Sequence, residues 1–517
     1  MIGGWLHLLF WLWLAAAALS ALSALTWHQW RRFARKARGP VTLALPKLGP
    51  ETALDRIFAP LEAANPGRSG VLALIENREA YAARVQSARM AGRSLDLMYY
   101  LWRTDLTGWL LIEELLAAAE RGVRVRLLLD DVNVQGFDRA FLALNQHPNV
   151  EVRLFNPTRN RGHSARRVLE MLLGLSRFNR RMHNKAWIAD GRLAIIGGRN
   201  VGDTYFDAEE SGLPHSRDAD VMLAGPVVSE VESLFDSYWN LGLALPILTL
   251  WPGLKVNLRA FHRRMARHNR SEAARAFAAR ALDGHEGSAL LTRRLRWTAR
   301  MTLLADPPDK ALGRRSGPWM GEAITALLRE ARHEVRLVTP YFVPGNDGCA
   351  LLSDLARRGV HVSVVTNALS VTDMVLVHGA YRHYRLPLLR AGVVLHEFAP
   401  PPRPDGQRDL LHTKVFLIDG RQAVVGSLNF DLRSAFMNTE LGVLFEEPEV
   451  FAELAAMLDR ETAPEQAHRL SLDRGRLHWS AVRGSGPSAP ARIEPGSPPV
   501  LRAISWVVGH LPIQSYL

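Results

Sequence analysis

Two stretches of the sequence carry the same chemically active side chains in the same order. Each has a histidine, a lysine two residues later, an aspartate five residues after the lysine and an asparagine ten residues after the aspartate. The residues are His183, Lys185, Asp190 and Asn200 in the first stretch and His412, Lys414, Asp419 and Asn429 in the second. Because an imidazole can act as a nucleophile or an acid, and ammonium and amide groups bind anions, the pattern predicts an anion site.

The spacing indicates how each stretch folds. Residues two apart on an extended strand point to the same face, so His and Lys of each copy should share one face. Asp-Gly at 190–191 and 419–420 is a strong hairpin signal, and the returning strands should bring the asparagines back beside the histidines. We therefore expect His, Lys and Asn of each copy on one rim, the two rims facing each other, and the aspartates in supporting positions at the hairpin ends. A single copy could arise by chance, but two copies with identical offsets argue against that reading.

The duplicated pattern resembles the phospholipase D superfamily, whose signature is a repeated His-Lys-Asp motif. Within it, residues from about 70 to 517 are most similar to the bacterial cardiolipin synthases, in particular the cardiolipin synthase C group. The stretches that carry this resemblance are residues 94–108, 123–133, 197–207, 217–228, 366–393 and 438–445. One departure is Gly198, where the superfamily usually has serine. The second copy keeps Ser427, so the two halves are not expected to be equivalent.

The resemblance implies both a fold and a reaction. The fold is α/β, with two phospholipase D-like α/β sandwich domains related by pseudo-two-fold symmetry and the active site at their interface. The reaction makes cardiolipin by transferring a phosphatidyl group to phosphatidylglycerol through a phosphohistidine, with His183 as nucleophile and His412 as acid and base. Phosphatidylethanolamine is a second candidate donor. The alternative is hydrolysis of lipid or nucleic acid through the same intermediate. An inactive membrane scaffold is a third reading, which the intact second motif disfavours.

Candidate site residues follow from the motifs and their surroundings. The candidate catalytic residues are His183, Lys185, Asp190, His412, Lys414 and Asp419, and the candidate phosphate-binding residues are Asn200, Asn429 and Ser427. Two later carboxylates, Asp220 and Glu440, are expected to accept a hydrogen bond from a catalytic imidazole and fix its tautomer. No His, Asp or Cys cluster has metal-ligand spacing, so we predict neither a metal nor a cofactor.

Composition indicates a membrane and an anionic partner. The net charge of +13 favours a polyanion, and the lipid-type stretches favour anionic phospholipid over nucleic acid. Residues 5–27 contain no charged side chain and as a helix would cover about 34 Å, enough for a bilayer core of about 30 Å. Five Lys or Arg residues follow within residues 28–38, which predicts a single-pass bacterial inner-membrane protein with its catalytic part in the cytoplasm. A cleaved signal peptide is the alternative. The single cysteine, Cys349, excludes an intramolecular disulfide.

The order of patterns along the chain predicts six segments. They are an anchor with a basic juxtamembrane segment (1–38), a linker (39–70), a first phospholipase D-like domain (71–252), a basic interdomain segment (253–315), a second such domain (316–480) and a tail with an apolar helix (481–517). The first domain should contain helices at 76–91 and 107–121 and strands at 94–100 and 123–129; the second should contain strands at 334–342 and 360–366 and helices at 348–358 and 378–391. Residues 157–181 carry seven arginines around an apolar run, which indicates a basic surface helix or an amphipathic element on anionic lipid.

Overall fold

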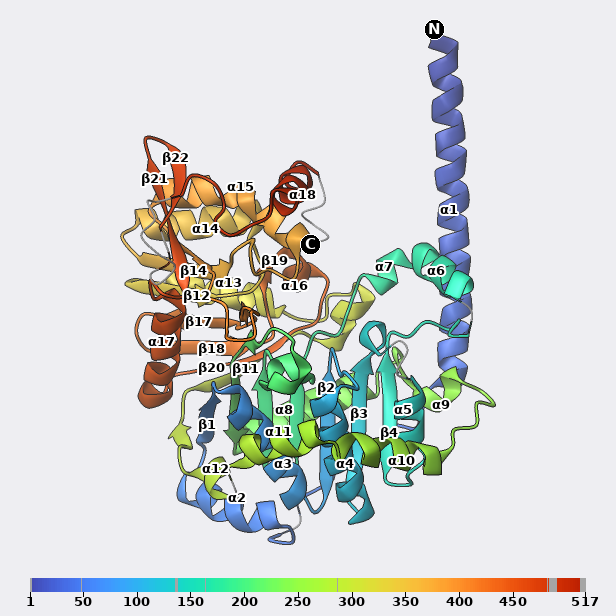
Figure 1. Cartoon of the computed structure of the whole chain (residues 1–517). Coiled ribbons are helices and arrows are strands. Elements are labelled where there is room, and N and C mark those ends of the chain that lie inside the picture. The colour runs from blue at the N-terminus through green and yellow to red at the C-terminus, as the bar shows by residue number, and fades with distance from the viewer. Residues whose placement is uncertain are drawn as a thin grey trace.

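The chain is described here by a computed structural model, which covers residues 2–47, 49–134, 138–162, 164–285, 287–480, 482 and 491–511. Within these residues, two nine-stranded mixed sheets form the body of the molecule (Figure 1). The order of the first sheet is β10 (Arg296–Thr298), β1 (Ser69–Leu74), β8 (Asp220–Ala224), β6 (Leu193–Gly197), β5 (Ala186–Ala189), β2 (Ser94–Tyr99), β3 (Arg124–Asp130), β4 (Val150–Phe155) and β9 (Ala244–Pro246). The order of the second is β11 (Met301–Ala305), β20 (Leu441–Phe445), β18 (Gln422–Gly426), β17 (Val415–Ile418), β12 (Glu334–Val338), β14 (His361–Asn367), β15 (Val394–Phe398), β21 (Ala467–Asp473) and β22 (Arg476–Trp479).

The two sheets repeat one topology. Strands β1-β8-β6-β5-β2-β3-β4 of the first correspond in order to β11-β20-β18-β17-β12-β14-β15 of the second. In both, the last three strands run parallel and the others pair antiparallel. The sequence therefore predicted the α/β class and the duplication correctly.

Helices cover both faces of each sheet. In the first half they are α2 (Ala53–Ala64), α3 (Asn77–Met90), α4 (Leu106–Glu120), α5 (Asp138–Leu144), α6 (Ser164–Leu173), α7 (Leu175–Phe178), α8 (Pro226–Trp239), α9 (Ile247–Leu250), α10 (Leu258–Asn269), α11 (Glu272–Leu282) and α12 (Ala289–Thr292). In the second half they are α13 (Met320–Glu330), α14 (Gly345–Arg357), α15 (Val375–Ala391), α16 (Leu432–Phe436), α17 (Pro448–Thr462) and α18 (Pro499–Gly509). Short 3-10 turns are η1 (Asp131–Asn133), η2 (Asp203–Tyr205), η3 (Glu209–Ser211) and η4 (Pro308–Leu312), and the short strands are β7 (Ser216–Arg217), β13 (Phe342–Val343), β16 (Leu410–Leu411) and β19 (Phe430–Asp431).

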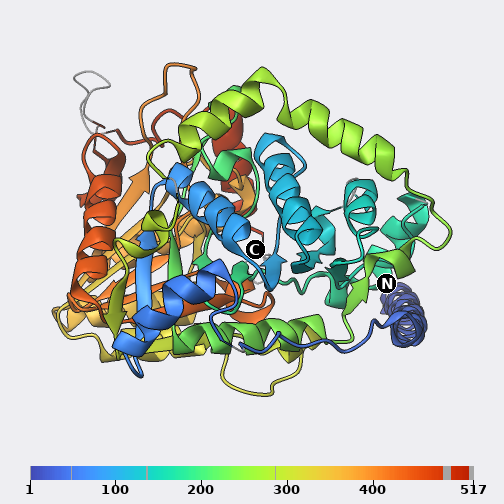
Figure 2. The same cartoon turned by 90° about the horizontal axis from the view of Figure 1, so that it is seen from below.

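Most elements lie where the hydrophobic periodicity placed them. The predicted strand at 334–342 is an exception, because β12 ends at Val338 and β13 begins at Phe342. Pro340 lies between them and has no N–H for a ladder hydrogen bond, which explains the break. The basic segment after residue 253 forms two helices, α10 and α11, along the outside of the first half (Figure 2). Ser271 separates them by capping α11 through the N–H of Ala274.

The two halves share a hydrophobic core. The buried cluster of the first half continues into β17, β18 and β20 of the second, through residues such as Val415, Val425 and Val443. Residues 296–305, which lie within the predicted interdomain segment, supply an edge strand to each sheet, β10 to the first and β11 to the second. Apolar burial therefore fixes the relative position of the halves. It also fixes the positions of side chains from the two halves that meet in the clefts between them.

Helix α1 (Ile2–Ala37) contains the segment predicted to span a membrane. Its carboxyl-terminal part packs on the first half, where Trp30 Nε1 donates to the carbonyl oxygen of Pro157 at 3.0 Å. Its amino-terminal part extends away from the body, as Figure 1 shows, and the helix is seen end-on in Figure 2. Among the described residues, the combination of length and apolarity needed for a membrane crossing is not met by any helix.

The hairpins that carry the two motifs are fastened by their aspartates. Asp190 and Asp419 adopt left-handed backbone angles, with φ of 52° and 51°, at the turns between β5 and β6 and between β17 and β18. Asp190 accepts hydrogen bonds from the backbone N–H groups of residues 92–94 at 2.7–3.0 Å, and Asp419 from those of residues 332–334 at 2.8–3.0 Å. Strands β5 and β17 lead from the histidine and lysine of each motif to its aspartate, so the aspartates lie at the far ends of these strands. There Asp190 holds its hairpin to the start of β2, and Asp419 holds its hairpin to the start of β12. Their inclusion among the catalytic residues was wrong, whereas their expected position at the hairpin ends is confirmed.

Replacing Asp190 by Ala should destabilise the first half. The change leaves three backbone N–H groups without their carboxylate acceptor. It also puts alanine, which adopts positive φ less readily than Asp or Asn, at this turn, and together these effects should cost about 2 kcal/mol or more of unfolding free energy. Asp190→Asn, which tolerates the same backbone angles and keeps one acceptor oxygen, should lose less. Thermal unfolding followed by circular dichroism measures both. Equal midpoints for Asp190→Ala and the unaltered protein would contradict this role.

Candidate active site

The structure brings the two motifs together at the interface of the halves. His183 and Lys185 lie on the chain leading into β5, and His412 and Lys414 on the chain leading into β17. Each histidine is tied by its backbone to the opposite half, because His183 N–H donates to Thr439 O at 2.9 Å and His412 N–H to Arg217 O at 2.7 Å. The parallel pairing of β16 with β7 extends the second of these contacts. The expectation that the two rims face each other is confirmed.

Each imidazole is held by a carboxylate from the opposite half. His183 Nδ1 lies 2.9 Å from Glu440 Oε2, and His412 Nδ1 lies 2.6 Å from Asp218 Oδ2. A proton on Nδ1 that is donated to the carboxylate leaves the Nε2 lone pair of the neutral ring available for chemistry. The predicted contact between Glu440 and a motif histidine is confirmed.

The prediction for Asp220 was wrong, because the residue that contacts His412 is Asp218. Asp220 instead forms ion pairs with Arg84 at 2.8 Å and Arg199 at 3.4 Å. Strand register explains the error: Gly197 pairs with Asp220 in the first sheet, and Gly426 pairs with Gly442 in the second. Asp218 lies two residues before Asp220, and Glu440 lies two residues before Gly442, so Asp218 is the structural counterpart of Glu440. Aligning the two sequences by the apolar strands that follow these acids instead pairs Asp220 with Glu440, an error of two residues.

The serine that distinguishes the second motif does not point to a substrate. Ser427 is fully buried, and its hydroxyl donates to Glu440 Oε2 at 2.5 Å while accepting from the N–H of Leu441 at 3.0 Å. Its assignment as a phosphate-binding residue is therefore corrected. At Gly198 a Cβ atom would lie only 2.1 Å from Asp218 Oδ1, so the first half has no room for the equivalent serine. There the Ala219 N–H donates to Asp218 Oδ1 at 2.8 Å instead.

The two lysines are buried beside the histidines. Lys185 Nζ donates to the carbonyl oxygen of His183 at 2.7 Å, and Lys414 Nζ donates to the carbonyl oxygen of His412. Burial lowers the pKa of both ammonium groups, for Lys185 well below its usual value, although nearby carboxylates oppose the shift. An anion in this cleft would stabilise the charged form of both lysines, because a nearby negative charge raises the pKa that burial lowers.

The asparagines retain unused hydrogen-bonding capacity. Asn200 Nδ2 donates to Tyr205 Oη at 3.0 Å, and the Oδ1 atoms of Asn200 and Asn429 are buried without a partner. A half-turn of an amide exchanges its nitrogen and oxygen, so these side chains can offer a donor to a bound anion. Their role in phosphate binding stays a prediction. Among the described residues, no three or more His, Cys, Asp and Glu side chains are grouped so as to hold a metal ion.

Two tyrosines beside the histidines were not identified from the sequence. The ring of Tyr100 contacts that of His183 edge-on at a centroid distance of 4.9 Å, and the ring of Tyr205 contacts that of His412 in the same way at 5.2 Å. Lys185 Nζ also lies 5.4 Å from the Tyr100 ring centroid. Both tyrosines fall in stretches that carry the family resemblance, but neither has a motif spacing that would single it out. Each half-site therefore includes an aromatic wall that restricts the orientation of its imidazole.

Electrostatics makes the two half-sites different. Burial and then Lys185 and Lys414 lower the pKa of His183 well below its usual value. Burial and Lys414 also lower the pKa of His412, but Asp218 opposes the shift. Burial would raise the pKa of Asp218, yet Lys414 and His412 outweigh it and hold that pKa below its usual value, whereas burial raises the pKa of Glu440 to about 7. His183 is thus the histidine more strongly held in its neutral form, and His412 has the more firmly charged carboxylate beside it.

The sequence of this chain is similar to those of known proteins. Residues 84–239 and 324–462 match the family described as cardiolipin synthase, PLD-like domain. The chain is 38% identical over 441 residues to cardiolipin synthase C of Escherichia coli (strain K12), a match that covers 81% of this chain and 90% of that protein. It is 26% identical over 392 residues to cardiolipin synthase A of Salmonella arizonae (strain ATCC BAA-731 / CDC346-86 / RSK2980), covering 75% and 68%.

The fold of this chain is similar to that of a solved structure. The crystal structure of phosphatidylserine synthase from Haemophilus influenzae Rd KW20 superposes with a TM-score of 0.54 at 12% identity, over 77% of this chain and 87% of that one. The family model covers more than half of the chain, and the similarity to cardiolipin synthase C extends over most of both proteins. The chain belongs to the cardiolipin synthase family of phospholipase D-like proteins.

Proposed function

We propose that this chain is a phosphatidyltransferase that makes cardiolipin from phosphatidylglycerol through a phosphohistidine. The observation that carries the proposal is the reciprocal pair of histidines, each oriented through Nδ1 by a carboxylate of the other half. Two oriented imidazoles supply the nucleophile and the acid that exchange at phosphorus requires, and the family relationship supports a phospholipid substrate.

In the first half of the reaction, His183 is the nucleophile. Its neutral Nε2 attacks the phosphorus of a phospholipid and forms a P–N bond, because a neutral ring is not repelled by the phosphodiester charge. The P–O bond to the head-group alcohol breaks, and His412 donates its Nε2 proton to that leaving oxygen. The lower pKa of His183 and the charged Asp218 beside His412 support this division of roles.

In the second half of the reaction, the two histidines act in reverse. His412, now neutral, takes the proton from a glycerol hydroxyl of phosphatidylglycerol as that oxygen attacks phosphorus. The P–N bond breaks, which restores the neutral His183 and leaves the proton on His412. When water replaces the glycerol hydroxyl, the same intermediate is hydrolysed to phosphatidic acid, so hydrolysis is the outcome that any assay must separate from transfer.

Lysine and asparagine side chains bind the phosphodiester oxygens in this proposal. Lys185 and Lys414 approach from the two motifs, and Asn200 and Asn429 would each offer an amide N–H after a half-turn of the side chain. The two lysines are buried and oriented by the fold before substrate arrives, so they stabilise the charge that develops on phosphorus without reorganising.

We further infer that α1 anchors the enzyme at the bacterial inner membrane as a single-pass segment. Phe10, Trp11 and Trp13 are 53%, 61% and 67% exposed on the part of α1 that extends from the body (Figure 1). Arg31 and Arg32 follow on its exposed surface, where each basic residue near an anionic leaflet contributes about 1 kcal/mol of attraction. This arrangement would hold the active site close to phosphatidylglycerol on the cytoplasmic side.

The purified full chain should convert phosphatidylglycerol vesicles to cardiolipin and free glycerol. Thin-layer chromatography or mass spectrometry of the lipids measures the product, and adding phosphatidylethanolamine tests the second donor by release of ethanolamine. Phosphatidic acid as the sole lipid product would make the chain a phospholipase D. No turnover of either lipid would contradict the proposed function.

Replacing either histidine by alanine should reduce turnover by at least about 10³-fold, because each supplies a separate chemical role. With phosphatidylglycerol labelled in its phosphate, acid-free denaturation of the unaltered protein should retain label on His183. His183→Ala should retain none, while His412→Ala should accumulate label slowly. Circular dichroism checks that each variant is folded. Label recovered on His412 would reverse the two assignments.

Asp218→Asn should shift the pH dependence of kcat/KM. The Asp218 carboxylate raises the pKa of His412, so its removal lowers that pKa, and the acid form of His412 is lost at a lower pH. The alkaline limb should therefore move to lower pH, with a loss of about 10²-fold in kcat/KM. Asp220→Asn, which disturbs Arg84 and Arg199 instead, should lower the thermal midpoint and leave the limb in place. An unchanged limb in Asp218→Asn would remove Asp218 from this role.

A reporter fused after Leu517 tests the proposed topology. A protein that fluoresces only in the cytoplasm should be bright in that position, and an enzyme active only in the periplasm should be silent, because the basic residues that follow the apolar run resist translocation. The opposite pair of results would place the catalytic part outside the inner membrane. A mature chain shortened by about twenty residues would identify a cleaved signal instead.

A further inference from the structure

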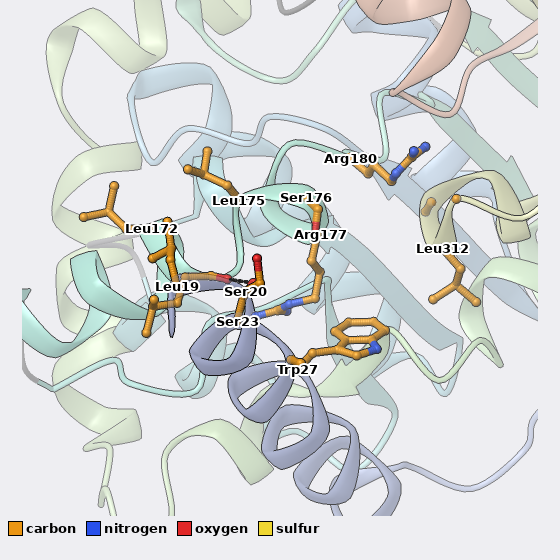
Figure 3. A pocket seen from close by; sticks show the side chains of 14 residues that line it. Leu19, Ser20, Ser23, Trp27, Leu172, Leu175, Ser176, Arg177, Arg180 and Leu312 are labelled. Carbon is orange, nitrogen blue, oxygen red and sulfur yellow. Dashed lines mark hydrogen bonds between the residues drawn. The ribbon is translucent and has the colours of Figure 1, made fainter. Parts of the chain in front are cut away.

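A cavity of about 700 Å³ lies between α1, the α6–α7 pair and η4, and we call it the α1–α7 pocket (Figure 3). Leu19 and Trp27 line it from α1, Leu172 and Leu175 from α6 and α7, and Leu312 and Arg180 from the opposite end. Its volume is in the range of about 300–1,000 Å³ found for small-molecule sites. Neither catalytic histidine lines it, so it is separate from the cleft in which the two motifs meet.

Several leucines in the wall of the α1–α7 pocket are exposed in the described part of the chain, beside Ser20 and Ser23 of α1. Leu19, Leu172 and Leu175 are 58%, 58% and 60% exposed, although all three face the same cavity. Three leucines exposed side by side form contiguous apolar surface, and surface of this kind marks a site of interaction. The slot suits a flexible hydrocarbon chain, because leucine side chains line one end of it, while the charged Arg180 lies at the other, polar end.

That polar end carries an uncompensated positive charge. Arg180 donates to the carbonyl oxygens of Lys310 at 3.2 Å and Phe436 at 3.3 Å, and within the described part of the chain it forms no ion pair with a carboxylate. The neighbouring Arg177 is different, because it is buried and pairs with Glu170 at 3.3 Å. Two carbonyl contacts orient the Arg180 guanidinium without neutralising it, which leaves its charge for an anion.

The pocket lies close in sequence to the proposed nucleophile. Arg180 precedes His183 by three residues, and three residues of fully extended chain span at most about 11 Å. Between them, Asn179 accepts a hydrogen bond on Oδ1 from Arg433 of the opposite half at 2.7 Å, and Arg433 is also among the charges that lower the pKa of His183. A molecule with its phosphodiester at His183 can therefore extend past Arg180 into the apolar slot.

We propose that the α1–α7 pocket holds an acyl chain of the membrane phospholipid whose phosphodiester is bound at His183, with Arg180 at the phosphate-to-glycerol end. This inference rests on the proposed function and adds a subsite to it. Charge complementarity and the short path from Arg180 to His183 favour a single anionic phospholipid as the occupant. A long acyl chain would gain binding energy in the slot, whereas a substrate with chains too short to reach it would not.

Two matched variants of α6 test this subsite. Leu172→Asp puts a charge into the slot, and Leu169→Asp removes a leucine that is 56% exposed on the same helix but does not line the α1–α7 pocket. Initial rates would be compared on vesicles of long-chain phosphatidylglycerol and on dihexanoyl phosphatidylglycerol kept below its critical micelle concentration. Leu172→Asp should lower kcat/KM on the vesicles at least tenfold and leave the rate on the short-chain lipid unchanged, while Leu169→Asp should change neither by more than twofold.

The failures of the subsite and of the function are distinguishable. Equal losses of kcat/KM in the two variants on vesicles would indicate a general membrane contact of α6 and would overturn the subsite. An unchanged kcat/KM of Leu172→Asp on vesicles would overturn it as well. Absence of lipid turnover by the unaltered chain on both substrates would overturn the proposed function itself.

A second readout does not depend on turnover. Phosphatidylglycerol with a photoactivatable group on its acyl chain, incorporated in vesicles with the unaltered full chain, should crosslink to peptides containing Leu172, Leu175 or Leu312. The same crosslinks should be lost in Leu172→Asp and kept in Leu169→Asp. Crosslinks confined to other surfaces, such as α18, would overturn the proposal.

Discussion

The structure depends on an exchange of carboxylates between its two halves. Glu440 of the second half orients His183, and Asp218 of the first half orients His412, so neither half can complete its own site. The backbone hydrogen bonds from His183 to Thr439 and from His412 to Arg217 fix the same register across the interface. A continuous apolar core joins the halves, and it includes Met182, Leu411 and Val415, which adjoin the motif residues, so apolar burial fixes the geometry of the histidines and lysines.

This arrangement concentrates positive charge in a buried cleft. Two lysines and two histidines share a space with two carboxylates, and burial lowers the pKa of every one of the cationic groups. Such a cluster costs folding free energy in the absence of an anion, and the large shared core offsets that cost. In the proposed reaction a phosphodiester would enter a cleft whose two lysines are already buried and oriented, and preorganised charge of this kind stabilises a transition state effectively.

The duplicated halves have diverged through a coupled change. The second half combines the longer Glu440 with the hydroxyl of Ser427, and the first combines the shorter Asp218 with Gly198, whose missing side chain leaves room for the carboxylate. The consequence is electrostatic, since the pKa of Asp218 falls below its usual value while that of Glu440 rises to about 7. Two copies of one motif therefore present histidines with different proton affinities, which is what a nucleophile and an acid require. Substituting one member of either pair alone would create a steric clash or leave a buried carboxylate without its donor.

The sequence by itself determined the α/β class, the duplication, the family and the identity of the groups that meet in the cleft, because strand periodicity and identical motif offsets are local properties of the chain. It could not determine which acid serves which histidine. Asp218 and Asp220 are equally plausible by spacing, and only the register of β6 with β8 decides between them. Likewise, Tyr100, Tyr205 and Arg180 join the site or its neighbouring pocket through contacts between segments far apart in the chain. Registers and interfaces of this kind are set by the packing of whole sheets against one another, so no local pattern encodes them.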